Sequence, residues 1–354
     1  MAWCAASELG WQVVPTFHSY ALTEALLTTL TRTLPLLVIG ALALAGCATS
    51  APPAAEPTPT VDPATPVTVD NCGFEVTFDT APERVVTIKS STTEALLALG
   101  LGDRIVGTAF QDGPVPDEWA ADAASLVSIS DMFPSEEVAL EQQPDLIYSG
   151  WESAFAPDAA GARPELASLG VASYVSPSAC QSSGQPAKLS FDNVFGDIEE
   201  VASIFRVDPA PLLAEQREQL ESIEKTGESR TAFWYSSGSD TPYAGAGIGA
   251  PQLVMETVGL TNIAADVTAT WAPLGWESVV DANPYFIVLI DADWNTVAKK
   301  IALLEGNPAT ATLDAVAHER YLILPFASGE AGVRTVEAAA SLSQQIAALD
   351  KLAE

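Results

Sequence analysis

A lysine followed by three hydroxyl side chains is the first candidate binding segment of this 354-residue chain. Lys89, Ser90, Ser91 and Thr92 come directly after an apolar, strand-like run and open a helix-like one. Free N–H groups at a helix N-terminus, hydroxyls and one cationic side chain together favour an anion. The alternative interpretation is that these residues only cap the helix. The segment therefore predicts either an anion site or an ordinary helix start.

Aromatic and hydroxyl side chains form a second candidate set, most of them directly after other predicted strands. In α/β lobes ligands gather beyond the carboxyl ends of the strands. Flat Trp and Tyr faces suit an aromatic or conjugated ligand. Any single aromatic residue of this kind is more often part of the core or rim than of a ligand site, so the prediction rests on the set. Its members are Trp151, Tyr235, Ser236, Ser237, Tyr243, Trp271, Asp291 and Trp294, with Arg334 at the start of the last predicted helix.

Residues that carry catalysis or hold a metal ion are scarce. Beyond residue 46 the chain has one histidine, His318, beside Glu319 and Arg320 in a predicted surface turn. Catalytic triads and zinc sites built on several histidines are excluded by that number. The run Gly245–Gly249 lacks the G-x-G-x-x-G spacing and is interpreted as a flexible lip of a cleft. We therefore expect neither an enzyme nor a bound metal or cofactor.

The charge balance limits the kinds of molecule that this protein is expected to bind. The chain has 15 Lys and Arg against 46 Asp and Glu, a formal net charge of −31. Nucleic acid binding is disfavoured, because phosphates need a basic surface. Self-repulsion of this size keeps a protein dispersed, and we expect a monomer.

The first 46 residues are predicted to be a lipoprotein signal peptide. The apolar run 34–46 is too short to cross a bilayer as a mature helix. It leads into Leu44-Ala-Gly-Cys47, which resembles a bacterial lipobox, so Cys47 is predicted to be lipidated and to become the N-terminus. The alternative is an ordinary signal peptide with a chance cysteine. Arg32 alone supplies positive charge before the apolar run, which a start codon placed too early would explain.

Residues 47–66 are predicted to be a disordered tether. After Cys47 they consist almost wholly of Ala, Pro, Thr and Ser, which bury too little apolar surface to fold. Fully extended, such a segment reaches roughly 60 Å. We therefore expect an extracytoplasmic protein that is lipid-anchored to the outer face of the cell membrane and touches the membrane only through its anchor.

Two of the four cysteines remain for the folded part. Cys4 falls in the predicted signal peptide and Cys47 at the lipidation site, which leaves Cys72 and Cys180. Exported domains with two remaining cysteines most often pair them. We therefore predict a Cys72–Cys180 disulfide, with two buried free thiols as the alternative.

A short helix-to-strand pattern occurs once in each half of the chain. Glu137 and Glu277 each open a predicted helix that ends before a proline seven residues later, Pro144 or Pro284, and a β-branched run follows. This pattern and the surrounding alternation predict two α/β lobes with mostly parallel sheets, joined by long helices. Predicted strands cover 84–88, 104–108, 145–148, 171–175, 231–235, 286–290 and 321–324. The predicted units are a lobe at 67–190, linking helices at 191–227 and a second lobe at 228–354.

Several of these segments resemble one family along residues 67–350. The chain is similar to the helix-linked (class III) substrate-binding proteins of ABC importers that serve ferric siderophores, cobalamin and haem. The resemblance implies a ligand held between two lobes and, as partners, an ABC permease and its ATPase. The matching stretches are 71–73, 81–86, 93–100, 144–147, 169–171 and 276–277.

The family resemblance also gives the two glutamates a role. In this family one Glu on each lobe docks onto arginines of the permease, and by position Glu137 and Glu277 match them. The alternative is two solvated glutamates, which the helix dipole favours at a helix start.

A closer resemblance covers the second lobe. Residues 233–243, 245–251 and 264–266 with Trp271 resemble actinobacterial proteins assigned to the precursor of the deazaflavin coenzyme (factor 420). This ligand implies a conjugated ring on the Trp and Tyr faces, a phosphate at Lys89–Thr92 and Arg334 opposite. The alternatives are a ferric siderophore, cobalamin or haem, and a surface lipoprotein with no transport role.

Overall fold

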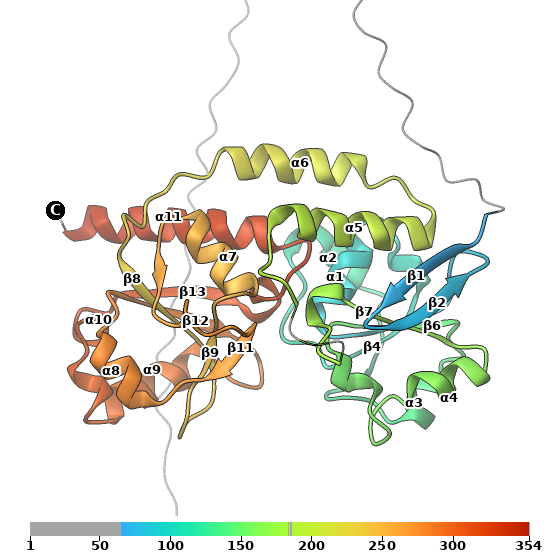
Figure 1. Cartoon of the computed structure of the whole chain (residues 1–354), viewed down its shortest axis with the longest axis horizontal. Helices are drawn as coiled ribbons and strands as arrows, with labels where there is room; N and C mark the ends of the chain where they lie inside the picture. The colour runs from blue at the N-terminus through green and yellow to red at the C-terminus, as the bar shows by residue number, and fades with distance from the viewer. Residues whose placement is uncertain (1–64, 183, 185, 354) are drawn as a thin grey trace, which may run out of the picture. The chain divides into compact units, whose positions relative to one another are not determined.

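The computed structural model describes residues 65–182, 184 and 186–353 (Figure 1). The predicted signal peptide, the lipidation site Cys47 and all but the end of the tether lie outside this part. Within the described ranges, no helix combines the length and the apolar character that a membrane span requires.

The N-terminal lobe is built on a five-stranded, all-parallel sheet with the order β5-β4-β3-β6-β7. Its central strands β3 and β6 are short and buried on both faces, as expected where helices cover a parallel sheet. The strands are β3 (Val85–Ile88), β4 (Ile105–Ala109), β5 (Ser128–Ser130), β6 (Leu146–Ser149) and β7 (Ala172–Val175). The helices are α1 (Ser90–Ala98), α2 (Ala120–Ala123), α3 (Glu136–Glu141) and α4 (Arg163–Ser168). A hairpin of β1 (Val67–Asn71) and β2 (Phe74–Phe78) precedes them.

The C-terminal lobe has a six-stranded sheet with the order β11-β9-β8-β12-β13, and β10 pairs with β8. Strands β8, β10, β12 and β13 are parallel, whereas β9 and β11 add antiparallel pairs at one side. The strands are β8 (Thr231–Ser237), β9 (Tyr243–Gly245), β10 (Thr261–Asn262), β11 (Trp271–Pro273), β12 (Phe286–Asp291) and β13 (Tyr321–Pro325). The helices are α7 (Ala250–Thr257), α8 (Trp276–Ala282), α9 (Val297–Gly306), α10 (Asp314–Ala317) and α11 (Thr335–Ala353). The prediction of two α/β lobes with mostly parallel sheets is confirmed.

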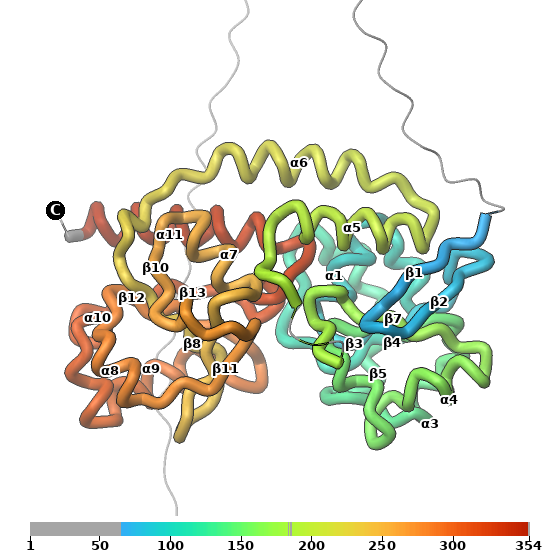
Figure 2. Tube along the Cα trace, in the orientation of Figure 1, coloured from blue at the N-terminus to red at the C-terminus, as the bar shows by residue number. Residues whose placement is uncertain are grey.

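Two helices connect the lobes. Helix α5 (Phe191–Phe205) begins with a capping box, in which the Ser190 hydroxyl accepts a hydrogen bond from the backbone N–H of Asn193. Helix α6 (Ala210–Glu221) has Pro211 in its first turn, where a proline costs no hydrogen bond. Figures 1 and 2 show α6 running across the top of the molecule from one lobe to the other. It contacts α11, and Gln216 Nε2 donates to the Val333 carbonyl over 2.7 Å.

Each sheet has an apolar core on both faces because its strands alternate buried side chains. On β12, Val288 and Ile290 face the core shared with α7 and α11. Ile287 and Leu289 face the opposite core, which includes Val279 of α8. Successive strand residues point to opposite faces, so one apolar run supplies both cores.

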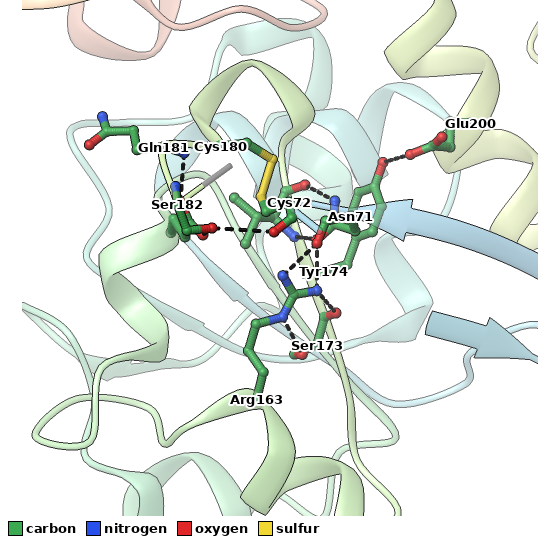
Figure 3. Close-up of a disulfide and its surroundings, with 11 residues drawn as sticks. Asn71, Cys72, Arg163, Ser173, Tyr174, Cys180, Gln181, Ser182 and Glu200 are labelled. Carbon is green, nitrogen blue, oxygen red and sulfur yellow. Dashed lines mark hydrogen bonds between the residues drawn. A yellow bond between two sulfur atoms is a disulfide. The ribbon is translucent and has the colours of Figure 1, made fainter. Parts of the chain in front are cut away.

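A disulfide ties the first hairpin to the loop after β7. Cys72 and Cys180 are bonded across a sequence separation of 108 residues (Figure 3). Beside the bond, the buried Arg163 guanidinium donates to the Asn71 carbonyl over 2.7 Å and to Ser173 Oγ over 3.0 Å. Asn71 in turn exchanges two hydrogen bonds with the backbone of Val175. The hairpin is thereby fastened to the carboxyl end of β7.

Removing this bond should cost much of the stability of the fold. Cys72→Ser with Cys180→Ser is expected to lower the free energy of unfolding by about 4–5 kcal/mol, because the unfolded chain regains the entropy of the open loop. Urea denaturation of the variant and of the reduced wild-type protein measures this loss. The unreduced wild-type folded domain should also show no titratable thiol. Equal stability of variant and wild type would contradict the account.

Candidate functional site

A cavity of about 360 Å³ lies between the lobes, beyond the carboxyl ends of their strands. This is the edge where ligands of α/β folds gather. The N-terminal lobe and the segment after it contribute Ser91, Gly150, Trp151, Glu152, Ser153, Ser176, Ser178, Ala179, Gln181, Pro186, Ala187 and Leu189. The C-terminal lobe contributes Ser236, Ser237, Tyr243, Ile248, Gly249, Ala250, Thr270, Trp271, Trp294, Phe326, Gly329, Glu330 and Ala331.

The structure brings part of the predicted binding set together in this cavity. The predicted residues that line it are Ser91, Trp151, Ser236, Ser237, Tyr243, Trp271 and Trp294. The predicted residues that do not line it are Lys89, Ser90, Thr92, Tyr235, Asp291 and Arg334. Apart from Trp271 and Tyr243, these residues lie in the last positions of a strand, follow a strand end, or open a helix after one.

Aromatic rings from both lobes form one wall of the cavity. Trp151 of the N-terminal lobe lies edge-on to Phe326 of the C-terminal lobe, with ring centroids 6.0 Å apart. Trp294 packs against the same Phe326 ring at 5.2 Å. Phe326 was not among the predicted residues, although it directly follows the last residue of β13. The strand-end rule that found Trp151 would also have found Phe326.

Lys89 lies beneath this wall, and its expected contact with a phosphate does not agree with the structure. The side chain is fully buried and forms an ion pair with Asp112. Its ammonium sits 4.1 Å from the Phe110 ring centroid, 4.0 Å from that of Trp151 and 4.5 Å from that of Phe326. A buried charge needs such a partner. Because Asp112 already neutralises Lys89, the ammonium is not available to an anionic ligand.

The hydroxyls beside Lys89 are also mostly engaged in the protein. Ser90 Oγ accepts a hydrogen bond from the Asp112 N–H over 2.8 Å. Thr92 Oγ1 donates to the carbonyls of Ile88 and Lys89, each over 3.0 Å. Of the four residues predicted as an anion site, only Ser91 reaches the cavity.

The other three residues away from the cavity have structural partners. Tyr235 is buried and donates its hydroxyl to the Gly238 carbonyl over 2.6 Å. Asp291 accepts from the Val297 N–H at the start of α9. Arg334 is buried, with Glu337 at 2.8 Å and Glu94 at 3.5 Å. The predicted direct contacts of these residues with a ligand therefore do not agree with the structure.

The charged side chains that line the cavity are carboxylates. Among the described residues, none lining the cavity is Lys, Arg or His, whereas Glu152 and Glu330 are both present. Glu152 fixes the loop that follows Cys180. Its carboxylate accepts hydrogen bonds from the backbone N–H groups of Gln181 and Ser182 over 2.6 and 2.9 Å. Burial raises the pKa of the Glu152 carboxyl, but hydrogen bonds from Ser182 and Gln181 outweigh burial and hold the pKa below its ordinary value.

Glu330 is the charged residue that the sequence interpretation missed. Its Oε1 accepts a hydrogen bond from the indole N–H of Trp151, across the two lobes. Burial raises the pKa of its carboxyl to about 7, with Lys89 opposing the shift and Asp112 adding to it. It lies in the turn between β13 and α11, where no sequence pattern distinguishes it from a solvated glutamate.

The two glutamates predicted to dock onto a permease lie away from the cavity. Glu137 and Glu277 are exposed in the first turns of α3 and α8, one in each lobe. In Figure 1 both helices lie at the lower side of the molecule, opposite α6. Each helix leads into a parallel strand, β6 or β12, as the repeated pattern predicts. Their role in docking stays a prediction.

Two α/β lobes, joined by long helices and holding a cavity at their facing strand ends, define a binding protein for small molecules. The chain belongs to the periplasmic binding protein family, whose model matches residues 85–327. It is therefore a substrate-binding protein and not an enzyme. Such proteins act outside the cytoplasm with the permease and ATPase of an ABC importer.

Relatives and solved structures support this assignment along most of the chain. The chain is 25% identical over 312 residues to an uncharacterized ABC transporter substrate-binding lipoprotein, YvrC, of Bacillus subtilis, covering 88% of this chain and 95% of that one. It is 28% identical over 222 residues to the vitamin B12-binding protein of Yersinia pestis, covering 59% and 70%. A structure described as an ABC-type Fe3+-hydroxamate transport system from Saccharomonospora viridis superposes with a TM-score of 0.68 and 27% identity, covering 79% and 98%.

Proposed function

We propose that this protein captures a bulky, conjugated small molecule in the cavity between its lobes and delivers it to an ABC permease at the cell membrane. The observation that carries the proposal is the lining itself. It combines three tryptophans and several hydroxyls with carboxylates as its charged groups. Trp faces bind conjugated ligands, and hydroxyls orient them.

The charge of the lining supports an uncharged or cationic ligand. An anion entering the cavity would meet Glu152 and Glu330 and, among the described residues, no cation in the wall. The net charge of −31 also disfavours an anionic ligand, although salt screens this repulsion beyond about 8 Å. Ferric hydroxamate siderophores, many of them neutral or cationic, suit such a site. The Saccharomonospora viridis relative, described as an Fe3+-hydroxamate transport system, adds support.

The deazaflavin precursor is the second candidate. Its flat conjugated ring suits Trp151, Trp271 and Trp294, and the resemblance in the C-terminal lobe favours it. Among the described residues that line the cavity, its phosphorylated tail finds no cationic partner, because Lys89 is paired with Asp112 and Arg334 with glutamates. The lining therefore supports the ferric hydroxamate class over this anion, with cobalamin as a further uncharged possibility within the family.

Docking and anchoring complete the proposal. The exposed Glu137 and Glu277, one on each lobe, engage arginines of the permease. A lipid on Cys47 and the tether after it keep the protein beside that permease as a monomer.

Isothermal titration calorimetry with an uncharged ferric trihydroxamate and with the phosphorylated deazaflavin precursor tests the ligand class. We expect submicromolar binding of the trihydroxamate, weakened at least about tenfold (roughly 1.4 kcal/mol) by Trp271→Ala, because an aromatic face is lost. Trp119→Ala, outside the cavity, is the control. Tight binding of the deazaflavin precursor with no heat from the trihydroxamate would contradict the proposed ligand class and make the deazaflavin precursor the favoured ligand.

A further inference from the structure

The floor of the cavity holds two buried oxygen atoms that lack hydrogen-bond partners. Ser91 Oγ and Glu330 Oε2 are both buried and complete no well-formed hydrogen bond with the described residues, although the Ser91 hydroxyl is near enough to Glu330 to lower the pKa of its carboxyl. Both residues line the cavity, and Ser91 as a whole is only 8% exposed. Buried polar atoms in folded proteins nearly always have partners. Two such atoms in one cavity suit a ligand group that can donate a hydrogen bond to each of them.

Gly150 keeps the space above the serine open. A Cβ atom at this position would lie 2.7 Å from Ser91 Oγ and 3.1 Å from the Cβ of Lys89. Any other residue at position 150 would therefore crowd the hydroxyl. The absence of a side chain here preserves access to the floor.

The cations near the floor are already paired with other acids. Lys89 is paired with Asp112, and Arg334 with Glu337 and Glu94. No ion pair within residues 65–182, 184 and 186–353 includes Glu330. The Glu330 carboxylate accepts a hydrogen bond from the Trp151 indole on one oxygen, and the cation that lowers its pKa, Lys89, forms its ion pair with Asp112 instead.

We infer that Ser91 and Glu330 form a subsite for a protonated amine of the ligand. This inference rests on the proposed function and specifies the ligand further. An ammonium group has three N–H donors and no acceptor, so it can donate to Glu330 Oε2 and to Ser91 Oγ together. Charge-assisted bonds of this kind are the strong ones. The tryptophan faces of the cavity also attract a cation.

The subsite makes binding depend on pH. Burial raises the pKa of the Glu330 carboxyl to about 7, and the negative charge of Asp112 adds to this shift. The positive charge of Lys89 and the hydrogen bonds from Ser91 and Trp151 oppose it. The other titratable groups around the floor are Glu94 on α1, Tyr148 on β6, Arg334 directly before α11 and Glu337 on α11. An ammonium group binds the carboxylate form, so binding below pH 7 must first release a proton. Affinity should rise with pH through 7 and be about tenfold weaker at pH 6 than at pH 8.

Calorimetry with two matched probes tests the inference. One probe is a linear ferric trihydroxamate that bears a free ammonium group, and the other is its N-acetylated, uncharged form. At pH 8 the wild-type protein should bind the ammonium probe at least about tenfold more tightly than the acetylated probe. Glu330→Gln should bring the two affinities within about twofold and abolish the rise in affinity between pH 6 and pH 8. Glu199→Gln removes one exposed carboxylate outside the cavity and should retain both effects.

Each outcome of this experiment is decisive. Equal affinities of the wild-type protein for the two probes, or a preference that persists in Glu330→Gln, would overturn the subsite while the proposed function stands. If neither probe binds, the ferric hydroxamate class of the proposed function fails, and the subsite fails with it. Ser91→Ala introduces a side chain smaller than the native one, and it should also lower the preference for the ammonium probe over the acetylated probe. It provides the test if Glu330→Gln does not fold.

Discussion

Replacing Glu137 and Glu277 together by alanine is expected to reduce ligand import at least about tenfold, because each lobe loses its charged contact with the permease. Both carboxylates are exposed at the start of a helix, α3 in one lobe and α8 in the other. Neither lines the cavity, so the affinity for the ligand should stay within about twofold. Uptake into vesicles that contain the cognate permease and ATPase, with calorimetry alongside, measures both quantities.

The same helices provide the control for this experiment. Glu141 of α3 and Asp281 of α8 are also exposed acids, but they lie in the last turns and not in the first. Their double alanine variant removes the same charge from the same elements and should import at the wild-type rate. Import at the wild-type rate by the Glu137/Glu277 variant itself would refute the docking role.

Cys47→Ser is expected to transfer nearly all of the protein from the membrane fraction to the soluble fraction. The reason is that the proposed lipid on Cys47 is the anchor, and no helix in the described part of the chain has the character of a membrane span. Fractionation of cells and mass spectrometry of the N-terminal peptide measure the effect. Cys4→Ser, in the predicted signal peptide, should leave the protein at the membrane. Retention of the Cys47→Ser protein in the membrane fraction would show that another anchor exists.

The helices and strands could be predicted from the sequence because the residues that start and end them are close together in the chain. Pro144 comes three residues after the end of α3 and Pro284 two residues after the end of α8, and the apolar runs after them form β6 and β12. The linking helices predicted at 191–227 are α5 and α6, which are separated by residues 206–209 with Pro209 at the start of α6. Helix α6 ends at Glu221, six residues before the predicted end of the linking segment at 227.

The binding site was harder to predict because it depends on contacts between distant residues. The strand-end rule found Ser91, Trp151 and Ser236 in the cavity. It misjudged Lys89, since the acid that neutralises the lysine, Asp112, lies 23 residues further along the chain. Glu330 was missed for the same reason. Its burial against Trp151, 179 residues away, exists only once both lobes are folded.

The buried pair of Lys89 and Asp112 also explains how the aromatic wall is held in place. The Lys89 ammonium contacts the rings of Trp151 and Phe326, which come from different lobes. Asp112 Oδ1 accepts from the Trp294 indole over 3.2 Å, again across the lobes. A lysine that the sequence suggested as a ligand contact therefore orients the residues that form the cavity.

Native mass spectrometry of the protein extracted from the membranes of its own host tests the central claim most directly. The account predicts a main species heavier than the lipid-anchored polypeptide by one conjugated small molecule, uncharged or cationic when released. The polypeptide alone as the single species, or a bound anionic phosphate ester, would contradict it.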